Sequence, residues 1–210
     1  MIHPIVADLS HHNYENRTLN FIDAKAAGTI GVIYKSSEGS TYQDSTYASA
    51  RKLANSAGLL WGAYHFGTAA KVSNQVENFL KASQPDDKTL VCLDFEKNEL
   101  SEINTITIEI AIEFLELVTQ RLGRKPKLYT GPFMYEVFGS LPSVEFQKYK
   151  VWWARYADIE DLHPTWNEYW LWQYSDGHNG PKPHQIPGFG FCDCNHFNGT
   201  AQQLRDSWVE

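Results

Sequence analysis

Two acids stand two residues apart at the end of the apolar run Leu90-Val91-Cys92-Leu93-Asp94-Phe95-Glu96, which predicts a buried strand. Side chains alternate between the two faces of a strand, so Asp94 and Glu96 should point the same way, with Cα atoms about 6.6 Å apart. Two carboxyls that close do not both ionise easily, so the pKa of one should rise. A carboxyl with a raised pKa can act as a general acid near neutral pH. Taken alone, the pattern also fits acids that cap the next helix or pair with Lys97.

Other polar and aromatic residues fall near the carboxyl ends of further predicted strands. Asp8 ends the first predicted strand, and Asp193 lies near the end of the last one. In a closed barrel of parallel strands the first and last strands are neighbours, and functional groups gather where strands end. We therefore expect all four carboxyls around one mouth. The further side chains that we expect there, as contacts for a substrate, are Lys35, Glu38, Tyr64, Phe66, Tyr129, Trp153, Trp172 and Gln173.

Acidic and aromatic side chains in one cleft suit the cleavage of a glycosidic bond. One carboxyl protonates the leaving oxygen, a second stabilises the cationic sugar, and an aromatic ring stacks on the sugar face. Aromatic residues make up 14% of the chain, so rings are available both for such a cleft and for an ordinary core.

The elements that would position these groups follow from the spacing of apolar residues and of turn residues. Short apolar, β-branched or aromatic runs predict eight strands, at residues 5–9, 29–35, 60–66, 89–96, 127–130, 150–156, 170–174 and 190–195. Helical patterns lie between the early strands, at residues 19–27, 44–57, 72–80, 106–122 and 131–138. The gaps between the last three strands are rich in Pro, Gly, Asn, Asp and His, which predicts loops.

Five strand–helix units followed by three strands predict an α/β fold in which the sheet closes into an irregular TIM-like barrel. The alternative is an open, doubly wound sheet. The Gly-rich phosphate fingerprint expected of many such folds is absent from this sequence. The length of 210 residues predicts one domain spanning residues 1–210.

Composition limits the classes of partner. The net charge of −7 argues against binding to a nucleic-acid backbone. No stretch approaches the ~20 apolar residues of a membrane span, so we expect no membrane insertion. The start, MIHPIVADLS, lacks a basic segment followed by a long apolar run. We therefore expect a protein made in the cytoplasm without a signal peptide, which something else must release if it acts outside the cell.

The cysteines and one histidine are assigned by the alternation of faces along their strands. Cys192 and Cys194 flank Asp193 and should face away from the mouth, whereas Cys92 should point into the barrel. We expect three buried free thiols, with no bridge and no metal site. His65 has the wrong position in its strand to face the mouth.

At these residues the chain resembles glycoside hydrolase family 25, the Chalaropsis-type lysozymes of bacteria, phages and some fungi. The resemblance covers nearly the whole chain, and its specificity comes from the order of the motifs. These motifs are Val6-Ala7-Asp8-Leu9-Ser10, Lys35-Ser36-Ser37-Glu38-Gly39, Gly62-Ala63-Tyr64-His65-Phe66, Leu93-Asp94-Phe95-Glu96, the run from Gly123 to Thr130, Trp153-Ala154-Arg155-Tyr156, Trp172-Gln173-Tyr174-Ser175 and the run from Asp193 to Gly199.

The resemblance implies a (β/α)5(β)3 barrel that needs no cofactor. It implies hydrolysis of the β-1,4 bond between N-acetylmuramic acid and N-acetylglucosamine in bacterial peptidoglycan. Glu96 matches the general acid of the family and Asp94 the second catalytic carboxylate. Asp8 and Asp193 match its supporting acids. The positions that line the groove of the family fall on Tyr64, Tyr129 and Trp153.

Two departures concern packing and targeting. Cys192 and Cys194 bracket Asp193 where relatives usually have aliphatic residues, which affects packing and redox sensitivity more than catalysis. Many phage relatives carry a separate wall-binding module, which we do not expect within these 210 residues. We expect a monomer that reaches the wall by phage-type or holin-type release.

Several mechanisms and rival functions stay open on the sequence. Asp94 could attack the sugar, which needs carboxyls about 5–5.5 Å apart, or could orient the acetamido group of the substrate; an inverting route needs about 6.5–9.5 Å. A chitinase-like barrel is one alternative, although such enzymes usually have another Asp where this chain has Cys92. A non-catalytic glycan-binding barrel and a metal-dependent hydrolase are the others.

Overall fold

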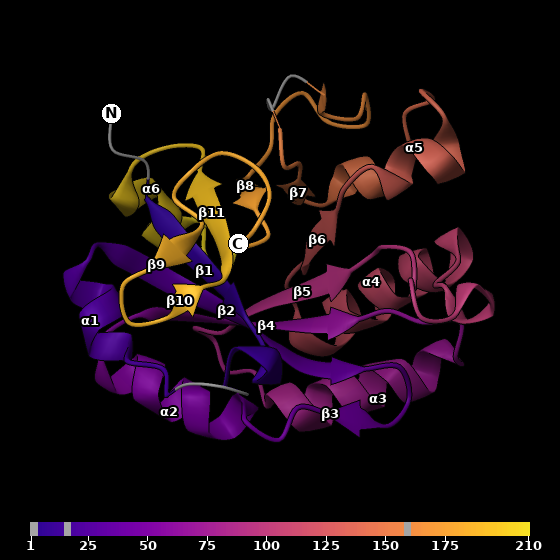
Figure 1. Ribbon diagram of the computed structural model, residues 1–210. Helices are drawn as coiled ribbons and strands as arrows, with labels where there is room; N and C mark the ends of the chain where they lie inside the picture. The colour runs from indigo at the N-terminus through magenta and orange to yellow at the C-terminus, as the bar shows by residue number, and fades with distance from the viewer. Residues whose placement is uncertain (1–3, 15–17, 158–160) are drawn as a thin grey trace.

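Eight strands close a barrel in the computed structural model of the protein, which describes residues 4–14, 18–157 and 161–210 (Figure 1). The barrel strands are β1 (Ile5–Leu9), β2 (Thr29–Glu38), β4 (Leu60–Phe66), β5 (Leu90–Asp94), β6 (Lys127–Thr130), β7 (Val151–Ala154), β8 (Leu171–Ser175) and β11 (Asp193–Phe197). Their order is β1-β11-β8-β7-β6-β5-β4-β2, and pairing of β1 with β2 closes the ring. The predicted closed α/β barrel is therefore confirmed.

The last barrel strand differs from the prediction in both position and direction. We predicted a strand over residues 190–195 that ends near Asp193, but β11 begins at Asp193 and runs antiparallel to β1 and to β8. Residues 190–191 belong instead to β10 (Gly190–Phe191), which pairs with β9 (Gln185–Ile186) in a separate two-stranded sheet. Because β11 is reversed, its first residue lies at the barrel end where the parallel strands finish.

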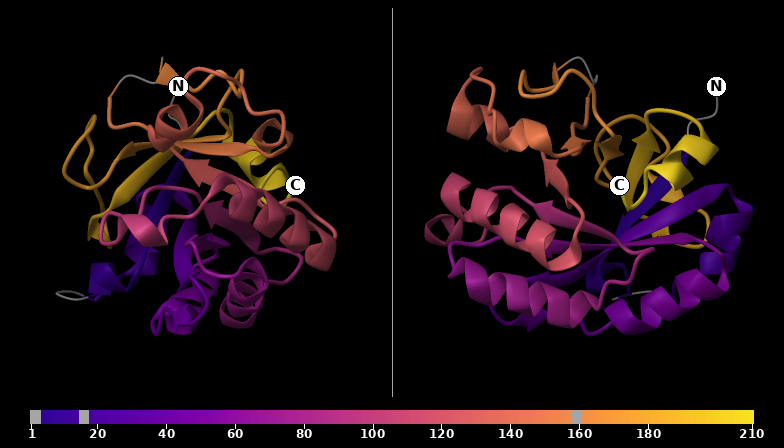
Figure 2. Two further views of the ribbon diagram at one scale, coloured as in Figure 1. Left: turned by 90° about the vertical axis from the view of Figure 1, so that its right-hand side faces the viewer. Right: turned by 180° about the vertical axis from the view of Figure 1, so that it is seen from behind.

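Helices follow the first five parallel strands. They are α1 (Phe21–Ala26), α2 (Tyr47–Ser56), α3 (Val72–Ser83), α4 (Ile108–Leu122) and α5 (Phe133–Phe138), with a further α6 (Ala201–Asp206) near the end of the chain. Figures 1 and 2 show α1 to α4 side by side along one side of the barrel. Short 3-10 helices, η1 (His11–Tyr14), η2 (Glu102–Asn104) and η3 (Phe146–Lys148), and a short strand β3 (Tyr42–Gln43) beside β2 complete the described elements.

Local chemistry fixes several helix ends. The side chain of Asn20 accepts hydrogen bonds from the backbone N–H groups of Ile22 and Asp23 at the start of α1, and Thr107 caps α4 in the same way. Helix α4 ends at Gly123, whose φ of 69° lies in the left-handed region that glycine adopts without strain. Gly123 is the one of these signals that also marked the end of the predicted helix.

The core has two parts, one inside the barrel and one between the barrel and its helices. The inner part includes Val6, Ile33 and Cys92, and Trp208 packs with them. The Trp208 indole donates a hydrogen bond to the carbonyl of Trp61 at 2.8 Å. Its ring lies 2.7 Å from where a Cβ on Gly31 would stand, so Gly31 provides room for the ring. The segment after α6 thus closes the amino-terminal end of the barrel.

The thiols lie on the predicted sides of the sheet: Cys92 packs inside the barrel, whereas Cys192 and Cys194 pack in the outer layer. All three are buried and free. None of the helices within the described residues is both long enough and apolar enough to cross a membrane.

Candidate active site

A small cavity of about 70 Å³ lies where the parallel strands end. Its lining comes from six strands or the residues directly after them, so the barrel brings together positions that are far apart in the sequence. The lining residues are Asp8, Tyr64, Asp94, Glu96, Tyr129, Trp152 and Asp193. The structure thus gathers all four predicted carboxyls, with two of the predicted aromatic residues, around one cavity.

Alternation along β5 and the residues after it points Asp94 and Glu96 to the same side. Strand β5 ends at Asp94, and the backbone stays extended because the N–H of Phe95 donates to the carbonyl of Tyr129 at 2.9 Å. Phe95 is fully buried on the other side, with its ring 5.1 Å from that of Phe133. The D-x-E spacing therefore places two acids in the cavity and one anchoring ring in the outer layer.

Glu96 also lines a larger groove beside the acid cavity. This groove has a volume of about 350 Å³, and among its lining residues are Phe133, Arg155 and Tyr156. Glu96 and Tyr129 line both the groove and the cavity, whereas Asp94 lines the cavity. Glu96 thus stands where a ligand in the groove would meet the buried acids.

Burial sets the protonation of Glu96 and Asp193. Burial raises the pKa of Glu96 to about 7; Lys35 lowers it, and Glu99 raises it further. Burial also raises the pKa of Asp193 to about 7, with Asp176 and Glu96 adding to the rise. Each of these two acids therefore holds its proton through part of the range around neutral pH.

Burial also keeps Asp8 and Asp94 from ionising easily. The pKa of Asp8 is raised well above its usual range, by burial first and then by Asp193 and Glu96. The pKa of Asp94 is raised well above its usual range by burial and by Glu96, while Lys35 opposes this rise. Within the described residues, the buried Oδ1 atoms of Asp8 and Asp94 have no hydrogen-bond partner. Such atoms suit contact with a donor group of a ligand.

Gln173, which we predicted to contact the substrate, is fully buried behind the acids. Its Nε2 donates to Oδ2 of Asp8 at 3.0 Å and to Oδ2 of Asp193 at 3.4 Å. Its Oε1 accepts from the hydroxyls of Tyr129 at 2.8 Å and Tyr156 at 2.9 Å. One amide therefore joins two carboxyls to two tyrosines, so Gln173 is a positioning residue.

Lys35, Glu38 and Phe66 lie at the edge of the acid cluster. The ammonium group of Lys35 donates to Glu38 at 2.7 Å and stands 5.0 Å from the centre of the Phe66 ring. Lys35 is close enough to the acids to lower the pKa of Asp8, Asp94 and Glu96. It is thus the cation that partly offsets their burial, and Glu38 holds it in place.

A family model described as glycosyl hydrolases family 25 matches residues 7–182, a range that contains Asp8, Asp94 and Glu96. The chain belongs to this family. It is 30% identical over 184 residues to YegX of Escherichia coli O6:H1, a match that covers 81% of this chain and 60% of YegX. It is 27% identical over 213 residues to lysozyme M1 of Streptomyces globisporus, covering 94% of this chain and 68% of that protein.

A solved structure shares the fold over the full chain. The family 25 lysozyme of Aspergillus fumigatus is 26% identical to this chain, covers 100% of both chains and superposes with a TM-score of 0.81. The (β/α)5(β)3 barrel that the motifs implied for a family 25 chain therefore agrees with a solved structure.

Two predicted contacts of this family 25 chain were wrong. Trp153 is fully buried in the outer layer, where its ring packs against Trp166. Trp172 also points outward, since its neighbour Gln173 points inward, and its indole donates to the carbonyl of Arg155 at 2.8 Å. Neither tryptophan lines the acid cavity or its groove.

Trp152, rather than Trp153, faces the acids. Strand β7 pairs with β6 so that Trp152 stands opposite Tyr129, which points inward. The indole of Trp152 donates to Oδ1 of Asn195 at 2.6 Å, and Nδ2 of Asn195 donates to the carbonyl of Val6 at 2.9 Å. The signal that could have identified Trp152 was register with Tyr129, which requires knowing how the strands pair.

His65 is buried away from the mouth, as predicted, and its Nδ1 lies 2.8 Å from the hydroxyl of Ser37. Burial lowers its pKa to about 3. In the described part of the chain, no group of three or more His, Cys, Asp or Glu residues is arranged to hold a metal ion.

Proposed function

We propose that this chain is a peptidoglycan hydrolase that cleaves the β-1,4 bond between N-acetylmuramic acid and N-acetylglucosamine. The observation that carries the proposal is Glu96, a carboxyl with a pKa raised to about 7 that lines both a groove and a cavity of further acids. A carboxyl that is protonated near neutral pH can donate to the leaving oxygen of a glycosidic bond. Membership of family 25 supports the same substrate class.

Glu96 acts as the general acid in the proposed mechanism. A glycan strand lies in the groove with its scissile oxygen beside Glu96. Proton transfer to that oxygen lets the bond break as positive charge develops on the sugar. Tyr129, which lines the groove and the cavity, contacts the sugar at the point where the groove meets the acids.

The size of the cavity favours an orienting role for Asp94. The cavity around the acids is small, about 70 Å³, whereas the groove beside it measures about 350 Å³. The larger groove suits the sugar rings of a glycan strand, and the small cavity suits an acetamido substituent. We infer that Asp94 accepts a hydrogen bond from the N–H of the substrate acetamido group. The acetamido oxygen attacks the anomeric carbon as the glycosidic bond breaks and the leaving oxygen takes the proton of Glu96, and water then opens the cyclic intermediate. Direct attack by Asp94 would require the ring to descend into the cavity.

In this mechanism Asp8 and Asp193 are supporting acids that set the charge of the cavity. Both accept from the amide of Gln173, so their orientation is fixed before a substrate arrives. When Glu96 gives up its proton, its own carboxylate lies beside the positive charge that develops on the sugar and stabilises it.

The first test replaces Glu96 by Gln, which keeps the size of the side chain but removes the acid. Because general acid catalysis contributes about 10²–10⁴-fold, hydrolysis of purified peptidoglycan should fall by at least about 10²-fold. The thermal unfolding midpoint should not fall. The pKa of Glu96 is raised, so a neutral Gln side chain replaces a carboxyl that already favours its neutral form. A variant with full activity would refute the assignment of Glu96.

Product analysis separates the proposed bond from its alternatives. Mass spectrometry of digested peptidoglycan should find fragments that end in reducing N-acetylmuramic acid. Reducing N-acetylglucosamine ends would overturn the bond specificity. Equal turnover of chitin oligomers would support the chitinase-like alternative, and loss of activity in EDTA would support a metal-dependent hydrolase. Release of no reducing ends would leave only glycan binding.

A further inference from the structure

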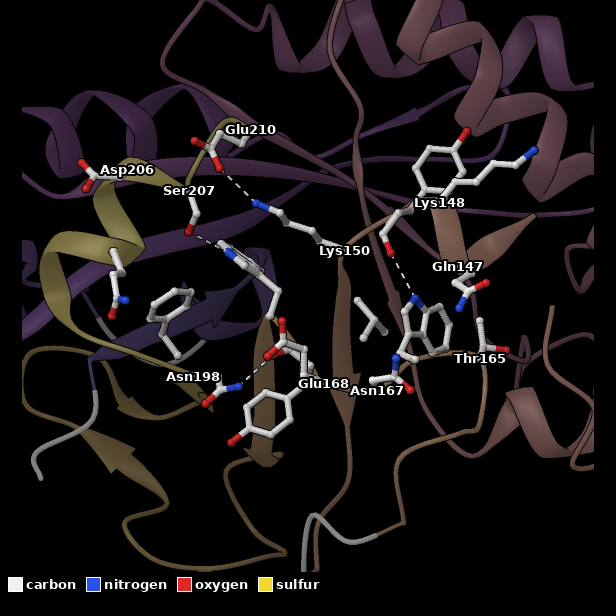
Figure 3. A pocket seen from close by; sticks show the side chains of 17 residues that line it. Gln147, Lys148, Lys150, Thr165, Asn167, Glu168, Asn198, Asp206, Ser207 and Glu210 are labelled. Atoms are coloured by element: carbon white, nitrogen blue, oxygen red, sulfur yellow. Dashed lines mark hydrogen bonds and ion pairs between the residues drawn. The ribbon is translucent and has the colours of Figure 1, made fainter. Parts of the chain in front are cut away.

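Figure 3 shows a second, larger cavity. It lies at the other end of the barrel from the acids. Val151, the first residue of β7, lines it, whereas Ala154, the last residue of β7, lines the groove beside Glu96. Phe197 also lines it, because the reversed strand β11 finishes at this end. We call this space of about 700 Å³ the basal cavity. It falls in the range of about 300–1,000 Å³ that is usual for small-molecule sites.

The aromatic part of the basal cavity offers carbon surface. Trp166 and Trp170 line it, but their indole N–H groups are already satisfied, by the carbonyl of Tyr149 at 3.0 Å and the hydroxyl of Ser207 at 2.9 Å. The ring of Tyr169, which is half-buried, also lines it. Trp166 and Trp170 are only 8% and 7% exposed, so the half-buried ring of Tyr169 is the one that can pack against the C–H face of a ligand, with the two indoles behind it.

Polar side chains lie around the basal cavity, as Figure 3 shows, with Asp206 and Ser207 across it from Gln147. Gln147, Asn167 and Glu168 make no side-chain hydrogen bond or ion pair with any other described residue. Two of these three are primary amides, which can donate and accept at once. Such groups suit the hydroxyl and acetamido groups of a sugar.

The charges around the basal cavity argue against an anionic ligand. Lys150 already pairs with Glu210 at 3.1 Å, and Lys148 pairs with Glu145. The carboxyls of Glu168 and Asp206 also line the cavity. A phosphate or a free carboxylate would therefore meet excess negative charge, whereas a neutral sugar would not.

We propose that the basal cavity is an accessory site for the N-acetylhexosamine units of a glycan strand. The proposal rests on the proposed function, since it takes its ligand from the same polymer. The two ends of β7 are about 10 Å apart at roughly 3.3 Å per residue, so the two sites open at opposite ends of the barrel. In this proposal the basal cavity holds a strand other than the one at Glu96, and so keeps the enzyme on a multi-stranded wall.

The test measures binding of the N-acetylglucosamine tetramer by titration calorimetry, in the Glu96→Gln chain so that no turnover occurs. We expect two tetramers per chain. The double change Gln147→Ala and Asn167→Ala should weaken one of the two binding events by about tenfold, since it removes two neutral hydrogen-bonding groups. Tyr169→Ala is a second variant, and Asn55→Ala on the exposed face of α2 is the matched control, which should still bind two.

Failure of this inference can be told apart from failure of the proposed function. If the groove binds no sugar, the parent binds one tetramer and the double variant binds it about tenfold more weakly. If the double variant and Tyr169→Ala both bind like the parent, the accessory site is wrong. Binding of wall fragments through their peptide alone, without binding of the tetramer, overturns it as well.

A rate comparison gives an independent readout. In the active chain, the double change should slow hydrolysis of insoluble walls about fivefold or more, and should leave turnover of soluble fragments unchanged. Equal rates for the variant and the parent on insoluble walls would contradict the proposal.

Discussion

Glu96 gains its raised pKa in a different way from the one that its spacing suggested. The D-x-E pattern predicted that repulsion would raise the pKa of one of the two acids, and Glu96 does raise that of Asp94. For Glu96 itself burial is the largest cause, and Glu99 adds to it. Glu99 lines the groove beside Glu96 and lies outside the acid cavity. A groove residue that is separate from the cluster can therefore set the pH at which the proposed acid loses its proton.

Replacing Glu99 by Gln should lower the pKa of Glu96, because it removes a negative charge that favours the protonated form. The rate falls as pH rises through the pKa of the general acid, so this falling limb, near pH 7 in the parent, should move to lower pH. The measurement is kcat/KM on soluble fragments across about pH 4–9, a range that contains both the ordinary and the raised pKa of Glu96. Glu113→Gln, at an exposed position of α4, is the control. An unchanged limb would show that Glu99 does not act on Glu96.

Gln173 should control both the rate of hydrolysis and the way in which that rate depends on pH. Gln173→Met keeps the volume but removes the amide that orients Asp8 and two tyrosines, and small displacements at a site can cost about 10²-fold in rate. Because the amide lowers the pKa of Asp8, that pKa should rise, and the acidic limb of the rate profile should move to higher pH. Trp172→Phe is the control, because Trp172 is next to Gln173 in the sequence but points away from the acids; this variant should keep most of the activity. A variant that is less stable but has the parent's rate and pH profile would make Gln173 merely structural.

Sequence patterns predicted the bounds of several strands but not the direction of the last one. Strands β1, β4 and β6 have the predicted bounds, because apolar alternation and flanking Gly or Pro residues mark them locally. The direction of β11 has no such local mark, since it depends on loops after β8 that carry no helix. The error at Trp153 has the same origin, because which face of a four-residue strand points inward is set by its neighbours. Asp193 was nevertheless placed at the mouth, although by a strand assumed to run the other way.

The segment after α6 should contribute strongly to stability. Trp208 is buried among residues of the barrel interior and donates to the carbonyl of Trp61. Trp208→Ala should lower the free energy of unfolding by about 3–5 kcal/mol, as for other large-to-alanine changes in cores. Denaturant unfolding measures the loss, and Trp208→Phe should lose less because it refills most of the space. A loss under about 1 kcal/mol would mean that the barrel does not need this closure.

At the scale of the whole molecule, the acid cluster links stability to pH. An acid whose pKa is higher in the folded state contributes its full stability below the unfolded pKa, and the contribution is lost as pH rises through the folded value. For Glu96 the pKa rises from 4.5 to about 7, which at 1.36 kcal/mol per unit is on the order of 3 kcal/mol. Asp193 rises to about 7 as well, so the two changes act over the same range of pH.

The free energy of unfolding should therefore fall between about pH 4 and pH 7, opposite to a protein held together by ionised carboxyls. The double change Glu96→Gln and Asp193→Asn should flatten that fall, since it removes two groups that must ionise inside the barrel. Denaturant unfolding at several pH values measures this, with Glu113→Gln as the control at an exposed carboxyl. If the parent and the double variant lose stability equally over this range, the acids at the mouth are not the origin of the pH dependence. A smaller fall in the double variant would mean that the native barrel bears a cost for keeping its acids buried, and that this cost grows as they ionise.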